Sequence, residues 1–98
     1  MIRIEWDPVK ATSNERKHEI QFEDAMHVFN DPNALFEQDR SDEGGESRWQ
    51  AIGSAGGVAV LLVAHAVRGD QGSEVIRLIS ARRATTKERK RYEEETGY

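Results

Sequence analysis

The chain has 98 residues, of which 37% are hydrophobic and 33% are charged, with a net charge of −4 and no cysteine. This length predicts one domain over residues 1–98, and the lack of cysteine excludes disulfides and thiolate metal sites. The longest apolar run is shorter than the roughly 20 residues that span a bilayer, and the N-terminus has no signal-peptide pattern. We therefore expect a cytoplasmic protein that does not enter a membrane.

The N-terminal third predicts a short strand followed by two helices. Residues 2–6 alternate between apolar and polar, as a strand does. Asp7-Pro8 then offers an N-cap and a favoured first helical residue, which predicts a helix that ends near residue 17 or 18. Residues 22–30 carry apolar side chains at helical spacing, so we expect a second helix there that stops at Asp31-Pro32.

The remaining two thirds predict a set of strands and a last helix. Loops are expected at 41–47 and 68–73, and short connections of this kind favour an antiparallel meander. Thr85 and Glu88 have the spacing of a capping box, which predicts that a helix begins after Thr85. The expected fold class is α+β, with helices packed on an antiparallel sheet. The candidate strands cover residues 34–39, 48–54, 57–67 and 74–81.

Charge is distributed unevenly along the chain. Residues 31–46 contain six acidic side chains and one basic one, whereas residues 77–91 contain seven Lys or Arg and a single acid, Glu88. A basic segment in an acidic chain suits the steering of an anionic ligand. A solvated charged surface would have the same composition, so the pattern alone does not decide between the two.

The side chains available for chemistry are Arg, Lys, His and Glu. The three histidines are scattered and form no metal-ligand pair, and we predict neither a metal site nor a cofactor. RNA cleavage by attack of the 2′-hydroxyl on the adjacent phosphate needs only a base, an acid and cations for the phosphorane charge. The same inventory would serve a simple RNA-binding domain or a domain that binds an acidic protein.

Six stretches of the chain together resemble the BrnT toxins, a branch of the RelE-like ribonuclease toxins of bacterial type II toxin–antitoxin systems. They are "IEWDPVKATSNERKH", "FEDAMHVFNDP", "GESRWQAIG", "VAHAVRGD", "VIRLISARRAT" and "ERKRYEEE". The resemblance implies a RelE-like fold and a metal-independent endoribonuclease that arrests growth. It also implies a BrnA-like antitoxin with a ribbon-helix-helix region, through which the complex binds operator DNA.

One departure from the family pattern concerns the loop after the first helix. BrnT sequences usually have Gly after the Lys-His pair, whereas this chain has Glu19 after Lys17 and His18. Glycine commonly serves at such a position as a left-handed helix cap. The sequence therefore leaves open how the chain turns after the first helix.

The resemblance and the residue chemistry nominate two sets of site residues. The candidate catalytic residues are Lys17, His18, Glu46, Arg48, His65, Arg77 and Arg82. The candidate RNA-binding residues are Arg83, Lys87, Arg89, Lys90, Arg91 and Tyr92. We expect strict alternation in the last strand to place Arg77 on one face, and Arg82, beyond the end of that strand, on the other.

Each nomination has a structural alternative. Lys17 and His18 can simply complement the C-terminal end of a helix dipole. Glu46 and Arg48 can form an exposed ion pair, and His65 can be a packing residue near a strand end. The last helix can be solvated by three i,i+4 pairs that start at residues 89, 90 and 91.

Two further readings compete with an RNA-cleaving toxin. One is a non-catalytic binding module that partners a ribbon-helix-helix repressor, and the other is a structural dimerisation domain. A homodimer is compatible with all three readings, because a chain this short and polar buries a modest core by itself.

Overall fold

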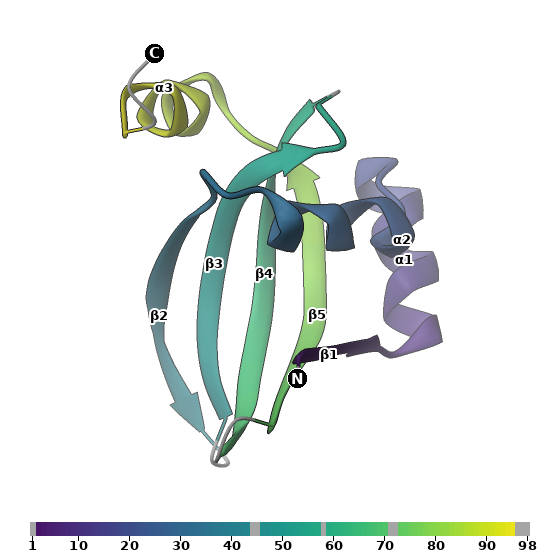
Figure 1. Ribbon diagram of the computed structural model, residues 1–98. Helices are drawn as coiled ribbons and strands as arrows, with labels where there is room; N and C mark the ends of the chain where they lie inside the picture. Colours follow the sequence, from purple (N-terminus) through teal and green to yellow (C-terminus); the bar gives the residue numbers. More distant parts are fainter. Residues whose placement is uncertain (1, 44–45, 58, 71–72, 96–98) are drawn as a thin grey trace.

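A five-stranded mixed sheet with helices at its sides forms the protein in the computed structural model (Figure 1). The structure describes residues 2–43, 46–57, 59–70 and 73–95, without the side chains of residues 40–43, 46 and 70. The elements in chain order are β1 (Ile2–Trp6), α1 (Pro8–His18), α2 (Phe22–Ala25), the 3-10 helix η1 (Met26–Asn30), β2 (Leu35–Glu43), β3 (Glu46–Ala55), β4 (Ala59–Asp70), β5 (Ser73–Arg83) and α3 (Thr86–Glu95).

The N-terminal elements follow the sequence pattern closely. The side chain of Asp7 accepts a hydrogen bond from the Val9 N–H at 2.8 Å, with Pro8 in the first helical position, as the N-cap prediction required. The expected second helix begins at Phe22 but tightens after Ala25 into η1. None of the helices in the described part of the chain has the length and apolar character needed to cross a membrane.

The strand order is β1-β5-β4-β3-β2. The four strands β2 to β5 form the antiparallel meander that the sequence predicted, while β1 joins the far edge in parallel with β5. The predicted loops at 41–47 and 68–73 were too long. Asp42 pairs with Ser47 and Asp70 pairs with Ser73, so both hairpins continue as strands to the edge of the described residues.

The core lies between the sheet and the helices α1, α2 and η1. We call this side the helix face, and Leu61, Val63, Leu78 and Ala81 point to it together with the fully buried Phe22 of α2. The opposite side is the open face, defined by Arg48, Ile52, Leu62, Ala66 and Arg77. Among the described elements, α3 contacts β3 and reaches the sheet through Glu88, which pairs with Arg82, and through Arg91, which pairs with Glu37.

A buried asparagine attaches α1 to the sheet. Strand β1 pairs with β5 only as far as Leu78, so beyond that point β5 has a neighbouring strand on its β4 side alone. Asn14 of α1 fills this position: its Nδ2 donates to the Ala81 carbonyl and its Oδ1 accepts from the Ala81 N–H, both at 2.9 Å. The side chain thus replaces one rung of a strand ladder and fixes the C-terminal half of α1 beside β5.

Candidate active site

Two arginines flank an alanine on the open face. Arg48 of β3 is paired with Ala66 of β4, and Ala66 is paired with Arg77 of β5. Residues in register on neighbouring strands point to the same side, so both guanidinium groups rise from one face about 10 Å apart at their Cα atoms. Ala66 is too small to separate them. Two arginines at this spacing can converge on a single phosphate group.

Glu5 completes this row at the edge of the sheet. It is paired with Arg77 across the parallel β1–β5 ladder. Its carboxylate accepts a hydrogen bond from Arg68 at 3.0 Å; Arg68 is exposed and Glu5 is half-buried. This end of the row is therefore a mixed acidic and basic surface, whereas the cationic part lies over β3, β4 and β5.

A bulge in β5 changes which side chains share a face. The register runs from Ala64 opposite Ser80 to His65 opposite Leu78, so one extra residue of β5 is inserted there. The buried residues of the strand accordingly skip from Leu78 to Ala81. The prediction that Arg77 and Arg82 lie on opposite faces was wrong, because strict alternation holds only while the register is unbroken.

Arg82 lies inside β5 and belongs to the open face, in register with Leu62. Its guanidinium forms a two-pronged ion pair with Glu88, at 2.9 Å to one carboxylate oxygen and 3.0 Å to the other. The same guanidinium donates to the Arg83 carbonyl at 3.2 Å, so three of its five N–H donors are engaged. Arg82 is thus held in a fixed position where β5 ends.

Glu88 also caps α3. Its carboxylate accepts from the Thr85 N–H at 2.8 Å, and the Thr85 hydroxyl accepts from the Glu88 N–H at 3.1 Å, which confirms the predicted capping box. The hydrogen bonds from Arg82, together with those from Thr85, lower the pKa of Glu88 to about 2. The Glu88 carboxylate in turn raises the pKa of Arg82, which stays charged.

The end of α1 brings Lys17 and His18 toward the β5 edge. They border a hollow of about 240 Å³ together with Lys10, Ser13 and Ser80. Ser80 is in register with Ala64 and therefore faces the same side as Arg77 and Arg82. Lys17 and His18 thus border the same hollow as Ser80, at the β5 edge of the sheet.

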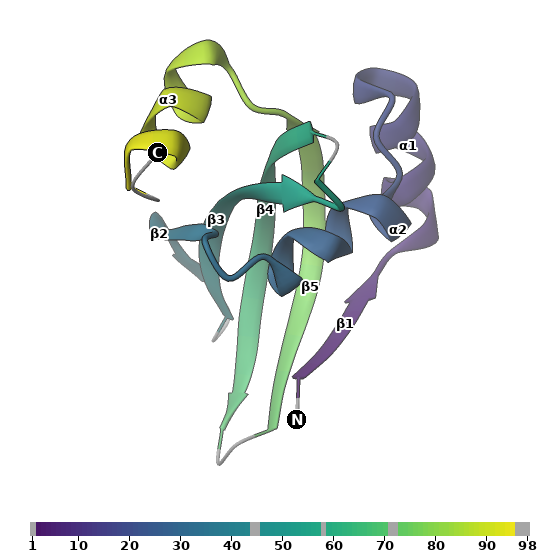
Figure 2. The same cartoon turned by 45° about the horizontal axis from the view of Figure 1, so that its top comes forward.

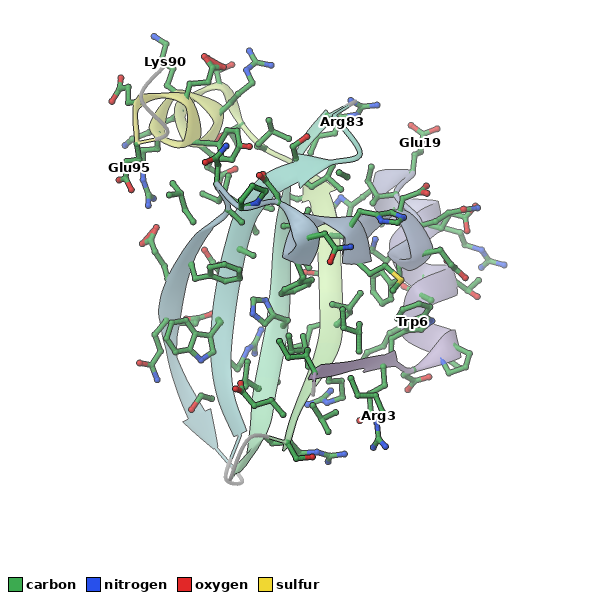
Figure 3. All side chains as sticks on the ribbon, viewed as in Figure 1. Arg3, Trp6, Glu19, Arg83, Lys90 and Glu95 are labelled. Carbon is green, nitrogen blue, oxygen red and sulfur yellow. The ribbon has the colours of Figure 1, made fainter. Side chains whose placement is uncertain are left out.

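Glu19 resolves the turn after α1. It adopts the left-handed conformation, with φ 58° and ψ 31°, and its N–H donates to the Glu15 carbonyl at 2.8 Å. The geometry normally supplied by glycine is therefore present with a glutamate, whose exposed side chain projects from the end of α1 in Figure 3. Glu19 is strained in this conformation, and it forms the turn directly after Lys17 and His18.

His65 does not join the arginine surface. It is paired with Leu78 and Trp49, which places it on the helix face with 2% of its surface exposed. Its ring packs edge-on against Phe29 at 4.8 Å. Burial lowers the pKa of the imidazole, so the ring is neutral at pH 7. This placement matches the packing alternative.

The basic residues of α3 divide into exposed and anchored ones. Lys87, Arg89 and Lys90 are exposed, with Arg89 in an i,i+4 ion pair with Glu93 at 3.7 Å. Arg91 forms an ion pair with Glu37 of β2. Arg83, also exposed, is in register with Leu61 and lies away from the open face, near the turn before β4.

Tyr92 fastens α3 to the rest of the fold. Its hydroxyl donates to Asp31 Oδ2 at 2.6 Å. Burial raises the pKa of Asp31, but hydrogen bonds from the Ser54 N–H, the Tyr92 hydroxyl and the Asn33 N–H outweigh it and leave that pKa below its usual value. In Figures 1 and 2, α3 lies above the start of β2, at the opposite edge of the sheet from α1.

Glu46 starts β3, but its side chain lies outside the described residues. Within the described part of the chain, no group of three or more His, Cys, Asp or Glu side chains is placed to hold a metal ion. Sequence reasoning missed the roles of Asn14 and Asp31, because each side chain bonds to residues far along the chain. The sequence signal for Asn14 was a polar residue inside a helix, and the signal for Asp31 was an Asp before Pro.

Comparisons with known proteins identify the family and support the fold. A family model described as "Ribonuclease toxin, BrnT, of type II toxin-antitoxin system" matches residues 6–88. Among solved structures, the chain is similar to the crystal structure of the Brucella abortus ribonuclease toxin BrnT, with 27% sequence identity and a TM-score of 0.65. That match covers 88% of this chain and all of the other. No curated protein matches.

Proposed function

Because the chain belongs to the BrnT family of ribonuclease toxins of type II toxin–antitoxin systems, we propose that it cleaves RNA on its open face without a metal ion. The observation that carries the proposal is the row formed by Arg48, Ala66 and Arg77. It places two cations where both can reach one phosphate.

The proposed reaction is attack of the RNA 2′-hydroxyl on the adjacent phosphate. The nucleophile belongs to the substrate, so the protein needs to move protons and to stabilise the charge of the phosphorane. Arg48 and Arg77 would bind the phosphate oxygens. Lys17 and His18, at the side of the same face, would exchange protons with the 2′-hydroxyl and the leaving 5′-oxygen.

Arg82 and α3 would position the rest of the RNA strand. Arg82 lies four residues along the sheet from Arg77's row, about 13 Å away, which is roughly two nucleotide steps. It would therefore contact a phosphate other than the one that reacts. Lys87, Arg89 and Lys90 continue this direction as an exposed basic track.

A protein antitoxin is inherent in a type II system. We propose that it is BrnA-like, with a ribbon-helix-helix region through which the complex binds operator DNA and represses its own promoter. The resemblance to BrnT toxins supports this assignment. The alternative of a non-catalytic partner for a repressor shares the complex but lacks RNA cleavage, so cleavage distinguishes the two.

The test is cleavage of a synthetic RNA by the purified chain in excess chelator, with analysis of the new ends. We expect a 2′,3′-cyclic phosphate or 3′-phosphate on one product and a 5′-hydroxyl on the other. Arg77→Ala should lower the single-turnover rate by about 10²–10³. Arg16→Ala, which removes a charge from the exposed side of α1, is the matched control and should cleave normally.

Products with 3′-hydroxyl and 5′-phosphate ends, or loss of cleavage in chelator, would show a metal-assisted hydrolysis instead. Normal cleavage by the Arg77→Ala variant would show that RNA is not cleaved on the open face.

A further inference from the structure

An apolar groove crosses the helix face below η1. It has a volume of about 430 Å³, and its walls come from all five strands and from η1. Ile2 of β1 and Phe36 of β2 mark its two ends, with Phe29, Trp49 and Val67 between them. Figure 1 shows why the groove exists: α2 and η1 cross only the upper part of the sheet, and its lower part has no helix in front of it among the described elements.

The ends of the groove expose large apolar side chains. Ile2 has 64% of its surface exposed and Phe36 has 49%. Two such residues at the opposite edges of one apolar groove indicate an interaction surface, since a scattered exposed residue needs no explanation but a contiguous patch does. The groove spans four strand spacings, about 19 Å, which corresponds to a helix of roughly 13 residues.

The charge of the groove limits what can occupy it. Its described lining includes one carboxylate, Glu74, and no lysine or arginine. An RNA strand would find no cation there. A second copy of the same surface would cover Glu74 without supplying a positive partner, and burying an unpaired carboxylate is costly. Glu74 is exposed at the groove, so an occupant with apolar side chains and a basic group fits this surface best.

We propose that this groove anchors the protein antitoxin through an amphipathic segment with an apolar stripe and a Lys or Arg that meets Glu74. The inference rests on the antitoxin of the proposed function but not on the chemistry of RNA cleavage. It also places the anchor on the helix face, on the opposite side of the sheet from Arg48 and Arg77. Anchoring and inhibition are then separate contacts, and a chain that silences the open face must continue around the sheet edge.

The experiment uses calorimetry to measure how tightly this chain binds its purified antitoxin, the protein encoded by the neighbouring gene. Ile2→Asn and Phe36→Asn should each weaken binding about tenfold or more, because each removes a buried apolar contact. Glu74→Lys should weaken it by a similar factor through charge reversal. Val9→Asn is the matched control, since Val9 is also a large apolar residue, 76% exposed, but lies on α1 outside the groove. It should bind within about twofold of the natural chain.

RNA cleavage by the free chain serves as the folding control, and all four variants should retain it. Groove variants that bind the antitoxin as tightly as the natural chain would overturn the proposal. So would loss of binding confined to Arg48→Ala and Arg77→Ala, which would place the anchor on the open face. A dimer of the isolated chain that the groove variants dissociate in sedimentation would make a second copy the occupant. If the chain cleaves no RNA at all, thermal unfolding replaces cleavage as the control and the binding test stands.

Discussion

Arg82 and Glu88 join the last strand to the last helix through two parallel hydrogen bonds, of 2.9 and 3.0 Å, between a guanidinium and a carboxylate. The same carboxylate caps the helix at Thr85. One acidic residue in the basic segment therefore fixes both an arginine of the open face and the start of the helix that carries most of the remaining positive charge.

This ion pair predicts a pH dependence of stability. The pKa of Glu88 is about 2 in the folded chain, against an ordinary value of 4.5, so folding favours its ionised form. Its contribution is present above about pH 4.5 and is lost as the pH falls toward 2. We expect Glu88→Gln to lower the free energy of unfolding by about 1–2 kcal/mol at pH 7, because partial exposure screens the pair.

Denaturant unfolding of both proteins between pH 7 and pH 2 measures this difference. It should shrink below pH 4.5 and become small near pH 2. Glu94→Gln, which removes an exposed charge of the same helix, is the control and should change stability by less than about 0.5 kcal/mol. A difference that is constant across this pH range would contradict the assignment to the Glu88 carboxylate.

A double-mutant cycle separates the two arginine positions of the open face. If Arg48 and Arg77 bind one phosphate, the effects of Arg48→Ala and Arg77→Ala on the single-turnover rate should be coupled by about 1–3 kcal/mol. Arg82 lies farther along the sheet, so the Arg77→Ala and Arg82→Ala effects should add within about 0.5 kcal/mol. Additive behaviour of the Arg48–Arg77 pair would show that they bind different phosphates.

Arg82→Ala alone should lower the rate by about tenfold, less than Arg77→Ala does, because Arg82 contacts a phosphate other than the one that reacts. Arg89→Ala and Lys90→Ala, on the exposed track, should cost less than about 1 kcal/mol each. Circular dichroism is needed beside the kinetics, because Arg82→Ala also breaks the pair with Glu88. A helix variant that silences cleavage while Arg82→Ala stays active would reverse this division of roles.

Glu19 offers a route to higher stability. A non-glycine residue in the left-handed conformation costs about 1–2 kcal/mol, and glycine adopts it without strain but loses more entropy on folding. We expect Glu19→Gly to raise the free energy of unfolding by about 0.5–1 kcal/mol. Glu19→Ala keeps the strain and is the control, with a change within about 0.5 kcal/mol. Equal stabilisation by alanine and glycine would attribute the effect to loss of charge.

The hydrogen bond from Tyr92 to Asp31 should contribute to the attachment of α3 to the rest of the fold. Tyr92→Phe keeps the ring and removes the hydroxyl that donates to Asp31, which should cost about 1–2 kcal/mol because the acceptor is a carboxylate. Amide hydrogen exchange should speed up in α3 and remain unchanged in β4, the central strand. Uniform acceleration across the sheet would show that the contact supports the whole fold rather than the helix.

Local order was readable from the sequence because it depends on neighbouring residues. The Asp7-Pro8 start of α1 and the Thr85–Glu88 capping box appear as predicted, since each rests on contacts within four residues. The family resemblance, which the family match confirms, likewise came from contiguous stretches.

The tertiary structure decided how these pieces face one another. The bulge in β5 arises from pairing with β4, and it alone brings Arg77 and Arg82 to one face. Asn14 holds α1 through Ala81, a residue 67 positions away, and this contact sets where Lys17 and His18 lie. A sequence pattern fixes only the period of a strand or helix. Which side chains share a surface depends on register between segments that meet only in the folded chain, because a shift of one residue exchanges the two faces.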